Sequence, residues 1–360
     1  MPIIDADTHV DETEDTWDYM LPGEQPLKPT VGYPSNPDPT RAITRYWVVD
    51  GERHPRFSRS DEKTHTTVQT RELLDVKARL RDMDAMGVQH HVIYPTLFLV
   101  QPTQRPETDL AIKRSYNRWL GHRCDESGGR LRWVCLPPAG DMQEAVKELR
   151  WAKEHGCVGV LKKGDREAGK WVDDEYFFPM YKEAESLNLP LCFHIGSGTF
   201  DRVPGREFIS GAFLRLRMPV LHAFQSLVAQ KVPQQFPRLR CGFIEAGAGW
   251  VPDVLYTLAR RLAKPGEGAF GSKPPDYAVG PNLLKDLGLF VTCQVDEDLP
   301  YIIKFTGEDS PLVGSDYTHA DQSQQEDFEV RLRARAGKGD ISRAAVEKML
   351  YDNPKRLYGL

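Results

Sequence analysis

Eight short apolar runs, most of them separated by stretches with helical periodicity, constrain the fold of this 360-residue chain more than any other feature. Each run is rich in Val, Ile, Leu and Phe and is bounded by Gly or Pro, which is typical of buried parallel strands. The runs cover residues 2–9, 87–95, 131–137, 157–162, 189–195, 239–246, 289–294 and 311–316. This repeated strand-then-helix order predicts a single (β/α)8 TIM barrel domain over residues 1–360.

A doubly wound nucleotide-binding sheet is the alternative with the same alternation of elements. It would need GxGxxG directly after the first strand, or a GxxxxGK[ST] loop, and the sequence contains neither. The barrel is therefore the preferred interpretation.

Three connections are longer than βα units require, namely residues 11–70, 198–219 and 264–282. They are rich in Pro, Gly and charge, and in a barrel all three follow strands, which places them at the C-terminal face where active sites are built. We expect them to form the walls or lid of a substrate pocket. A partly disordered or oligomer-contacting arm is the alternative for residues 11–70.

Composition favours a small-molecule partner. The net charge of -5 arises from mixed charges along the whole chain, which predicts no basic face for nucleic acid or an anionic membrane. The N-terminus lacks the pattern of a signal peptide and no apolar run approaches the roughly 20 residues that span a bilayer, so a cytoplasmic location is expected. The six cysteines stand singly, and the four within the apolar runs, Cys135, Cys192, Cys241 and Cys293, are expected to be small buried hydrophobes.

Acids and histidines stand at the ends of four predicted strands. Asp7 and His9 close the first strand and, because side chains alternate with a period of two, they point to the same side. A barrel gathers all strand ends around one axis, so His194, Glu245 and Asp316 are expected to join them. Imidazole and carboxylate ligands together predict a divalent cation, Zn, Fe or Mn, with one or two ions per chain.

The chain also resembles a known family. In order, the segments IDADTHVDETEDTW, LCFHIG, FPRLRCGFIEAGAGWVP, LVGSDYTH and ISRAAVEKMLYDNPKRLYGL are similar to the amidohydrolase 2 branch of the amidohydrolase superfamily. That branch includes aminocarboxymuconate-semialdehyde decarboxylase and the resorcylate-type decarboxylases. The resemblance implies a TIM barrel, a homodimer or larger homo-oligomer, and a metal held by Asp7, His9, His194 and Asp316.

Two positions depart from the pattern of many relatives. The chain begins with Asp7-x-His9 instead of HxH, which is closer to the resorcylate-type decarboxylases. Glu245 stands where many relatives place a histidine base. Glu245 is a candidate general base, a candidate ligand of a second metal, or a structural residue. Lys162 lies where some members of the superfamily carry a bridging carboxylated lysine, and a charge partner or a solvated lysine is the alternative.

Further side chains are candidates for substrate contact. Trp17 and Trp250 follow the first and sixth strands, where they line the pocket or anchor loops. His319 either supports the loop after the eighth strand or touches substrate, and His222 either faces the barrel mouth or caps a helix. Several arginines are candidates to hold a carboxylate or phosphate, namely Arg71, Arg202, Arg206, Arg215 and Arg217.

The leading functional hypothesis is a metal-dependent hydrolase. The cation would polarise a carbonyl group and supply hydroxide, while Asp316 or Glu245 takes the proton of the water and returns it to the leaving group. An amide, ester, thioester or lactone would fit. The alternatives are a non-oxidative decarboxylase of an aromatic or unsaturated carboxylic acid and a non-catalytic ligand-binding barrel.

Overall fold

The computed structural model describes residues 2–35, 43–57, 59–196, 213–263 and 279–360. Eight parallel strands pair in the order β1-β5-β6-β7-β8-β9-β10-β11. Each lies within one of the eight apolar runs, and their bounds are β1 Ile4–His9, β5 His90–Tyr94, β6 Leu131–Cys135, β7 Cys157–Leu161, β8 Leu191–His194, β9 Cys241–Ile244, β10 Leu289–Thr292 and β11 Pro311–Leu312.

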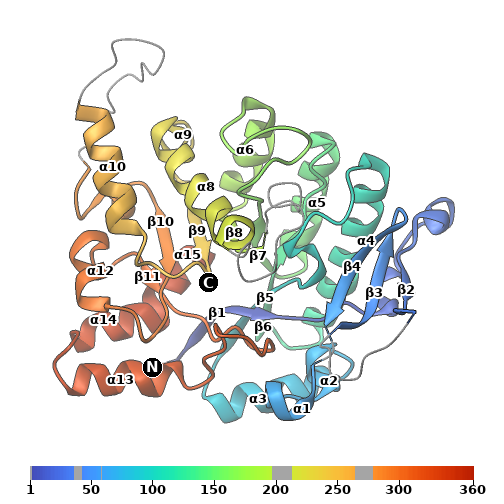
Figure 1. Cartoon of the computed structure of the whole chain (residues 1–360), viewed down its shortest axis with the longest axis horizontal. Coiled ribbons are helices and arrows are strands. Elements are labelled where there is room, and N and C mark those ends of the chain that lie inside the picture. The colour runs from blue at the N-terminus through green and yellow to red at the C-terminus, as the bar shows by residue number, and fades with distance from the viewer. Residues whose placement is uncertain (1, 36–42, 58, 197–212, 264–278) are drawn as a thin grey trace.

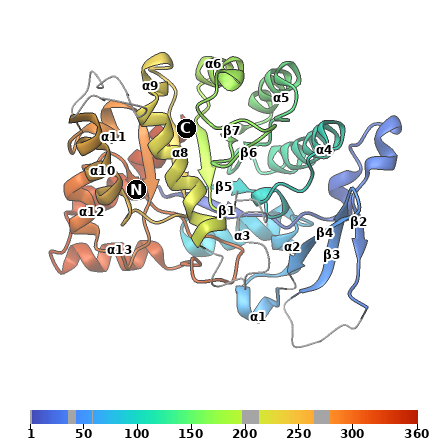
Figure 2. The same cartoon turned by 45° about the horizontal axis from the view of Figure 1, so that its top comes forward.

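Backbone contacts between the two edge strands close the sheet. Ala6 N donates to Val313 O at 3.3 Å, Asp316 N donates to Asp7 O at 3.0 Å, and a parallel bridge joins Thr8 to Tyr317. Figures 1 and 2 show the helices arranged around the strands. The prediction of a (β/α)8 TIM barrel is therefore confirmed.

The surrounding helices begin and end where local signals place them. The Asp75 side chain accepts a hydrogen bond from Lys77 N at the start of α3, and Gly87 ends this helix in the left-handed region at φ 68°. The longer helices are α3 Val76–Met86, α4 Pro106–Asp125, α5 Met142–Glu154, α6 Phe178–Ser186, α8 Met218–Ala229, α10 Val251–Ala263, α12 Leu299–Thr306 and α13 Phe328–Gly337. Shorter helices complete the ring, namely α9 Val232–Gln235, α11 Leu283–Asp286, α14 Arg343–Glu347 and α15 Asn353–Tyr358.

The register of the strands divides their side chains between two layers. Cys192 pairs with Gly242 and His194 with Ile244, and these residues face the barrel interior. Phe193 pairs with Phe243, which meets Phe224 of α8 with ring centroids 5.1 Å apart. The even-numbered positions of β8 therefore reach the interior, while the odd-numbered ones pack against the helices.

The long connection after β1 carries a small antiparallel sheet of its own. Its strands are β2 Thr30–Gly32, β3 Ile43–Val49 and β4 Glu52–Phe57, and it lies beside the barrel in both views (Figures 1 and 2). Trp47 of β3 meets Trp17 edge to face at 5.4 Å, which fastens the sheet to the chain that leaves β1. The short helices α1 Asp61–Thr64 and α2 Val68–Arg71 lead back to α3.

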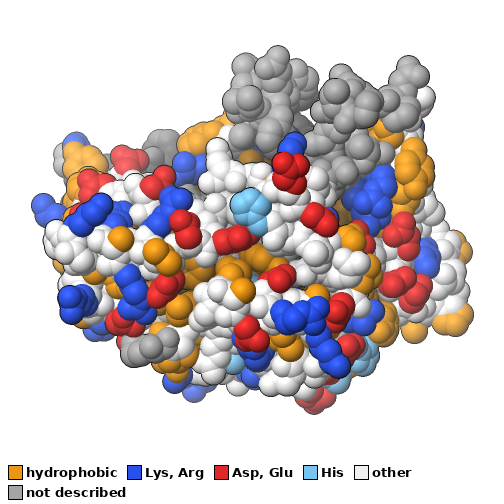
Figure 3. Space-filling view, turned by 90° about the horizontal axis from the view of Figure 1, so that it is seen from below, with side chains coloured by type: hydrophobic (Ala, Val, Ile, Leu, Met, Phe, Trp, Pro, Cys, Tyr) orange, Lys and Arg blue, Asp and Glu red, His pale blue; other side chains and the backbone are white. Residues whose placement is uncertain are grey.

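The other two long connections lie largely outside the described residues. Their described parts are a π-helical turn at Phe213–Arg217 and residues 279–282. Among the described residues, no helix combines the length and the apolar character needed to span a bilayer. All six cysteines are buried with free thiols. On the face in Figure 3, basic and acidic side chains are interspersed.

Candidate metal centre

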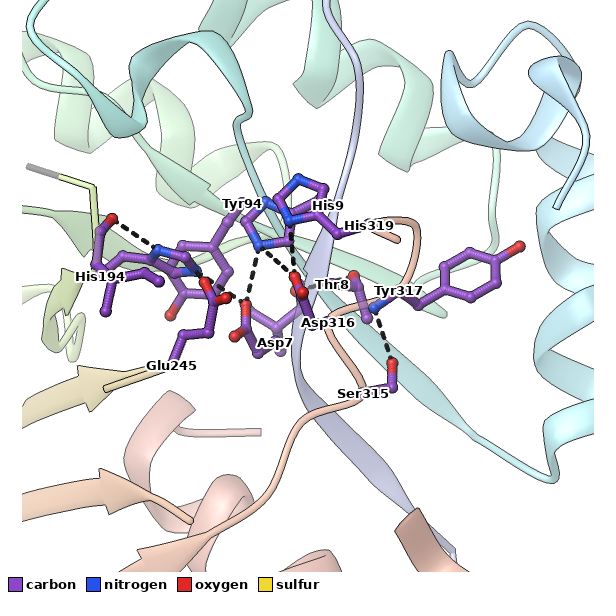
Figure 4. A network of polar contacts seen from close by, with 12 residues as sticks. Asp7, Thr8, His9, Tyr94, His194, Glu245, Ser315, Asp316, Tyr317 and His319 are labelled. Atoms are coloured by element: carbon purple, nitrogen blue, oxygen red, sulfur yellow. Dashed lines mark hydrogen bonds and ion pairs between the residues drawn. The ribbon is translucent and has the colours of Figure 1, made fainter. Parts of the chain in front are cut away.

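Imidazole and carboxylate side chains from four strand ends face one another at the mouth of the barrel (Figure 4). His9 Nε2 lies 3.4 Å from Asp7 Oδ1 and 3.3 Å from Asp316 Oδ1. His194 Nε2 lies 3.2 Å from Asp7 Oδ1 and 3.3 Å from Glu245 Oε2. All five side chains are buried. The structure thus brings together the residues that the sequence analysis proposed as metal ligands.

Both histidines direct Nε2 into this cluster. His9 Nδ1 lies 3.0 Å from the carbonyl oxygen of Pro95, and His194 Nδ1 lies 3.1 Å from that of Ile195. A carbonyl oxygen only accepts hydrogen bonds, so Nδ1 carries the proton in each neutral ring and Nε2 is left as an acceptor. These acceptors face carboxylate oxygens, and a cation between them would remove the repulsion.

Several of these acceptor atoms lack a hydrogen-bond partner among the described residues, namely His9 Nε2 and both carboxylate oxygens of Asp316. Buried polar atoms are rarely left without a partner, so the cluster fits a divalent cation held by carboxylate and imidazole groups. The ligand atoms form three overlapping sets, in each of which they lie within 4.8 Å of one another: Asp7, His9, His194 and Glu245; His9, Asp316 and His319; Glu245, Asp316 and Asp321.

Asp321 was missed by the sequence analysis. It is an exposed acid in the loop beyond Asp316, and its only signal is its place in the segment SDYTHAD. Its place in the third set makes Asp321 a further candidate ligand from the loop after β11.

Left-handed backbone conformations place two of the carboxylates. Glu245 has φ 61° and Asp316 has φ 54°, a region that non-glycine residues rarely adopt. Ile244 shares the inward row of His194, so simple alternation would turn Glu245 away from the barrel interior. The turn at Glu245 redirects its carboxylate to His194, and Glu245 N donates to Thr292 Oγ1 at 2.6 Å. Such strain is characteristic of functional sites.

The pKa shifts of the carboxyl groups also indicate a site that a cation would stabilise. Burial raises the pKa of Asp316 well above its ordinary value, and the charges of Glu245, Asp321 and Asp7 raise it further. Burial also raises the pKa of Glu245 to about 8, although the charge of His194 opposes the shift. For Asp7 burial acts upward, but His194 and His9 outweigh it and hold the pKa below its ordinary value. Without a cation the carboxylates therefore compete for protons.

Of the proposed substrate contacts, His319 lies closest to the cluster. Its ring stacks on His9 with centroids 3.8 Å apart, and its Nδ1 lies 2.8 Å from Asp316 Oδ1. Its Nε2 lies 3.3 Å from Thr96 Oγ1. Trp17 and Trp250 instead anchor structure: Trp17 is buried against Trp47, and Trp250 Nε1 donates to Gly247 O at 2.7 Å.

The remaining candidates lie elsewhere. Lys162 Nζ is 2.6 Å from Glu167 Oε2 and 4.1 Å from the centre of the Phe177 ring, so it has a structural partner. His222 Nδ1 lies 3.3 Å from Gly164 O. Arg217 donates to Ala246 O at 2.7 Å, and the buried guanidinium of Arg71 donates to Thr64 and Asp61. Arg215 is buried in the turn before α8, while Arg202 and Arg206 lie outside the described residues.

Comparisons with solved structures establish the fold. An amidohydrolase from Mycobacterium avium subsp. paratuberculosis K-10 is 16% identical, with a TM-score of 0.80 over 100% of this chain and 98% of that one. The 5-carboxyvanillate decarboxylase from Sphingomonas paucimobilis is 16% identical, with a TM-score of 0.69 over 100% and 99%. The 5-carboxyvanillate decarboxylase from Novosphingobium aromaticivorans DSM 12444, complexed with manganese and 4-hydroxy-3-methoxy-5-nitrobenzoic acid, is 21% identical, with a TM-score of 0.65 over 84% and 85%.

No curated protein matches the chain. The sequence pattern of the amidohydrolase family, by contrast, matches residues 4–360, from the first strand to the last residue. The stretch matched includes all the residues of the metal-binding cluster. The chain is therefore an enzyme of the amidohydrolase family.

Proposed function

We propose that the chain is a divalent-metal-dependent decarboxylase of an aromatic or unsaturated carboxylic acid. The observation that carries the proposal is the buried cluster in which the Nε2 atoms of two imidazoles face three carboxylates. The cluster lies in a barrel whose solved neighbours include two decarboxylases, one of them complexed with manganese. This proposal replaces the hydrolase as the leading hypothesis.

The cluster divides into cation ligands and a proton donor. Asp7, His9, His194 and Asp316 would hold the cation, which when bound supplies Lewis acidity toward the substrate carboxylate. Glu245 is the proton donor in our proposal. The bond between the substrate carbon and its carboxylate breaks, carbon dioxide leaves, and the electron pair stays on the substrate carbon. The Glu245 proton forms the new carbon–hydrogen bond, and water returns a proton to Glu245 afterwards.

Burial supports this division of roles. The low dielectric around the cluster strengthens each interaction between a charge and the reacting group. It also keeps bulk water away from the substrate carbon while the proton is transferred.

The sheet β2-β3-β4 and its flanking turns would form one wall of the substrate pocket. Asp11, Glu12, Trp47, Pro55, Arg56, Thr96 and Leu97 line a small hollow of about 20 Å³ between this sheet and the barrel. Thr96 reaches His319 from this hollow, and His319 stacks on His9. The described parts of residues 11–70 therefore form a wall of the site in our proposal. We also propose that the chain assembles as a homo-oligomer.

Hydrolysis is the second candidate, because a cation with an open coordination position also acidifies a bound water. Two substrate panels separate the candidates, each assayed with manganese and again after chelation. Carbon dioxide release from 2,6-dihydroxybenzoate or 5-carboxyvanillate, lost with the chelator, would support the decarboxylase. Cleavage of esters, thioesters or lactones without gas release would overturn it. The Asp316→Asn variant serves as the inactive control in both panels.

A further inference from the structure

Two adjacent lysines at the end of β7 point in opposite directions. Leu161 pairs with Cys192 in the parallel ladder, and Cys192 belongs to the inward row that contains His194. With a side-chain period of two, Lys163 therefore takes the inward register and Lys162 the outward one. The outward position of Lys162 agrees with its contacts to Glu167 and to the Phe177 ring.

The ammonium group of Lys163 is buried with few partners. The residue is only 4% exposed, and its Nζ donates to Phe98 O. The acid in its own loop, Glu167, is already engaged: Oε2 accepts from Lys162 Nζ and from Lys163 N, and Oε1 lies 3.9 Å from Lys113 Nζ. No carboxylate of the described residues forms an ion pair with Lys163. An ammonium has three donors, and leaving a buried one short of acceptors is costly.

The hydrogen bond of Lys163 to Phe98 connects it to the loop that also reaches the candidate metal centre. Phe98, its hydrogen-bond partner, follows β5 two residues after Thr96, which touches His319. The neighbouring residue Leu99 packs against Gly196, just beyond His194, so closely that a Cβ at Gly196 would lie 3.0 Å from Leu99 Cβ. Lys163 thus contacts the loop that follows β5, and this loop reaches His319 through Thr96 and Gly196 through Leu99.

We infer that Lys163 is a substrate-recognition residue that binds a second carboxylate of the substrate, so that the substrate is a dicarboxylic acid. The inference rests on the proposed function, because the metal centre would hold the first carboxylate. The burial that leaves Lys163 short of acceptors also lowers its pKa to about 7, despite the opposing charge of Glu167, and an arriving anion would complete its coordination.

The test compares two probes that differ by one carboxylate. Isothermal titration calorimetry measures the binding of isophthalate and of benzoate to the manganese-loaded protein. Wild type should bind isophthalate about tenfold or more tightly than benzoate, since a hydrogen bond to a charged group contributes about that factor. Lys163→Gln should abolish the preference without weakening benzoate. The control Lys147→Gln, which changes an exposed lysine of α5, should keep it.

Several outcomes would overturn the inference: an unchanged preference in Lys163→Gln, an equal loss in Lys147→Gln, or no measurable isophthalate binding to wild type. A second measurement needs no variant. Isophthalate should protect Lys163 from acetylation by acetic anhydride in the wild-type protein, as read by mass spectrometry, while Lys162 is unaffected and benzoate gives no protection. These readouts concern binding alone, so they distinguish failure of this inference from failure to decarboxylate either substrate of the activity panel.

Discussion

Asp5 and Ser315 hold each other beneath the candidate metal centre, although they lie 310 residues apart in the sequence. Asp5 Oδ1 accepts from Ser315 N at 2.9 Å, and Asp5 Oδ2 accepts from Ser315 Oγ at 2.5 Å. Asp5 Oδ1 also accepts from Asp7 N at 3.3 Å. One buried carboxyl group therefore fixes the backbone next to two of the candidate ligands, Asp7 and Asp316.

We predict that Asp5→Ala weakens manganese binding by about tenfold to a hundredfold, as is usual when a group that orients metal ligands is lost. The substitution removes both acceptors of Ser315 and leaves a buried N–H unpaired. Calorimetric titration with manganese measures the effect, and thermal unfolding checks the fold. The control is Asp253→Ala, which removes an exposed acid of α10. Equal manganese affinity in the two variants would contradict the positioning role of Asp5.

Much of the architecture could be predicted because buried parallel strands leave a local signal. Each apolar run needs only its own residues to be recognised, and the barrel then follows from their number and order. The convergence of Asp7, His9 and His194 follows from the same reasoning, since a side-chain period of two and a shared barrel mouth place them together.

What could not be predicted depends on tertiary pairing. The inward register of Lys163, and not of Lys162, is set by the pairing of Leu161 with Cys192, and nothing in the segment VGVLKKG encodes it. Trp17 follows β1 as expected but packs on Trp47, a partner from the small sheet. The Glu245 side chain points to His194 because its backbone is left-handed, and this conformation could not be predicted from a sequence that is typical of a strand.

Asp316→Asn should abolish turnover at every pH while the fold remains intact. The substitution removes a candidate ligand and an acidic group, and the carboxamide cannot replace the charge that would hold a cation beside His9. Carbon dioxide release between pH 5 and pH 9 and circular dichroism together test this. Near-normal activity would show that Asp316 is not part of the catalytic centre.

Glu245→Gln separates the alternative roles of Glu245. If Glu245 transfers the proton, turnover is lost while the metal content stays that of the wild type. If Glu245 also holds a second cation with Asp316 and Asp321, the metal content measured by elemental analysis falls by half. We expect the first outcome. Unchanged kinetics and unchanged metal content would instead assign Glu245 a structural role.

Glu12 should make the stability of the protein depend on pH. Burial raises its pKa to about 7. The hydrogen bonds from the N–H groups of Leu97 and Thr96 favour the charged form and oppose this shift. A carboxyl with a higher pKa in the folded chain stabilises the fold below its ordinary pKa, and this contribution is lost as the pH rises through about 7. As the pH rises from 4 to 8, the free energy of unfolding of Glu12→Gln should therefore increase by about 3 kcal/mol relative to that of wild type.

Urea unfolding of both proteins in the presence of a chelator measures this difference. Other buried groups with a shifted pKa, among them Asp5 and Glu245, are common to both proteins, so their contribution cancels in the comparison. The glutamine side chain has one hydrogen-bond acceptor fewer at every pH. This loss changes the difference in free energy of unfolding between the two proteins by a constant amount and does not make it depend on pH. A difference that stays constant from pH 4 to pH 8 would contradict the raised pKa of Glu12.

Gly314→Ala should displace Asp7 and abolish metal binding. A Cβ at Gly314 would lie 2.4 Å from Asp7 Cβ and 2.8 Å from Asp7 N, and the contact with the backbone of β1 leaves neither strand room to move. Manganese affinity and thermal stability should therefore fall together. Gly337→Ala is the matched control, because a Cβ there meets nothing within 4 Å and α13 gains a better helix former. If Gly314→Ala bound manganese as tightly as Gly337→Ala, this result would contradict the close approach of Gly314 to Asp7 beside the candidate metal centre.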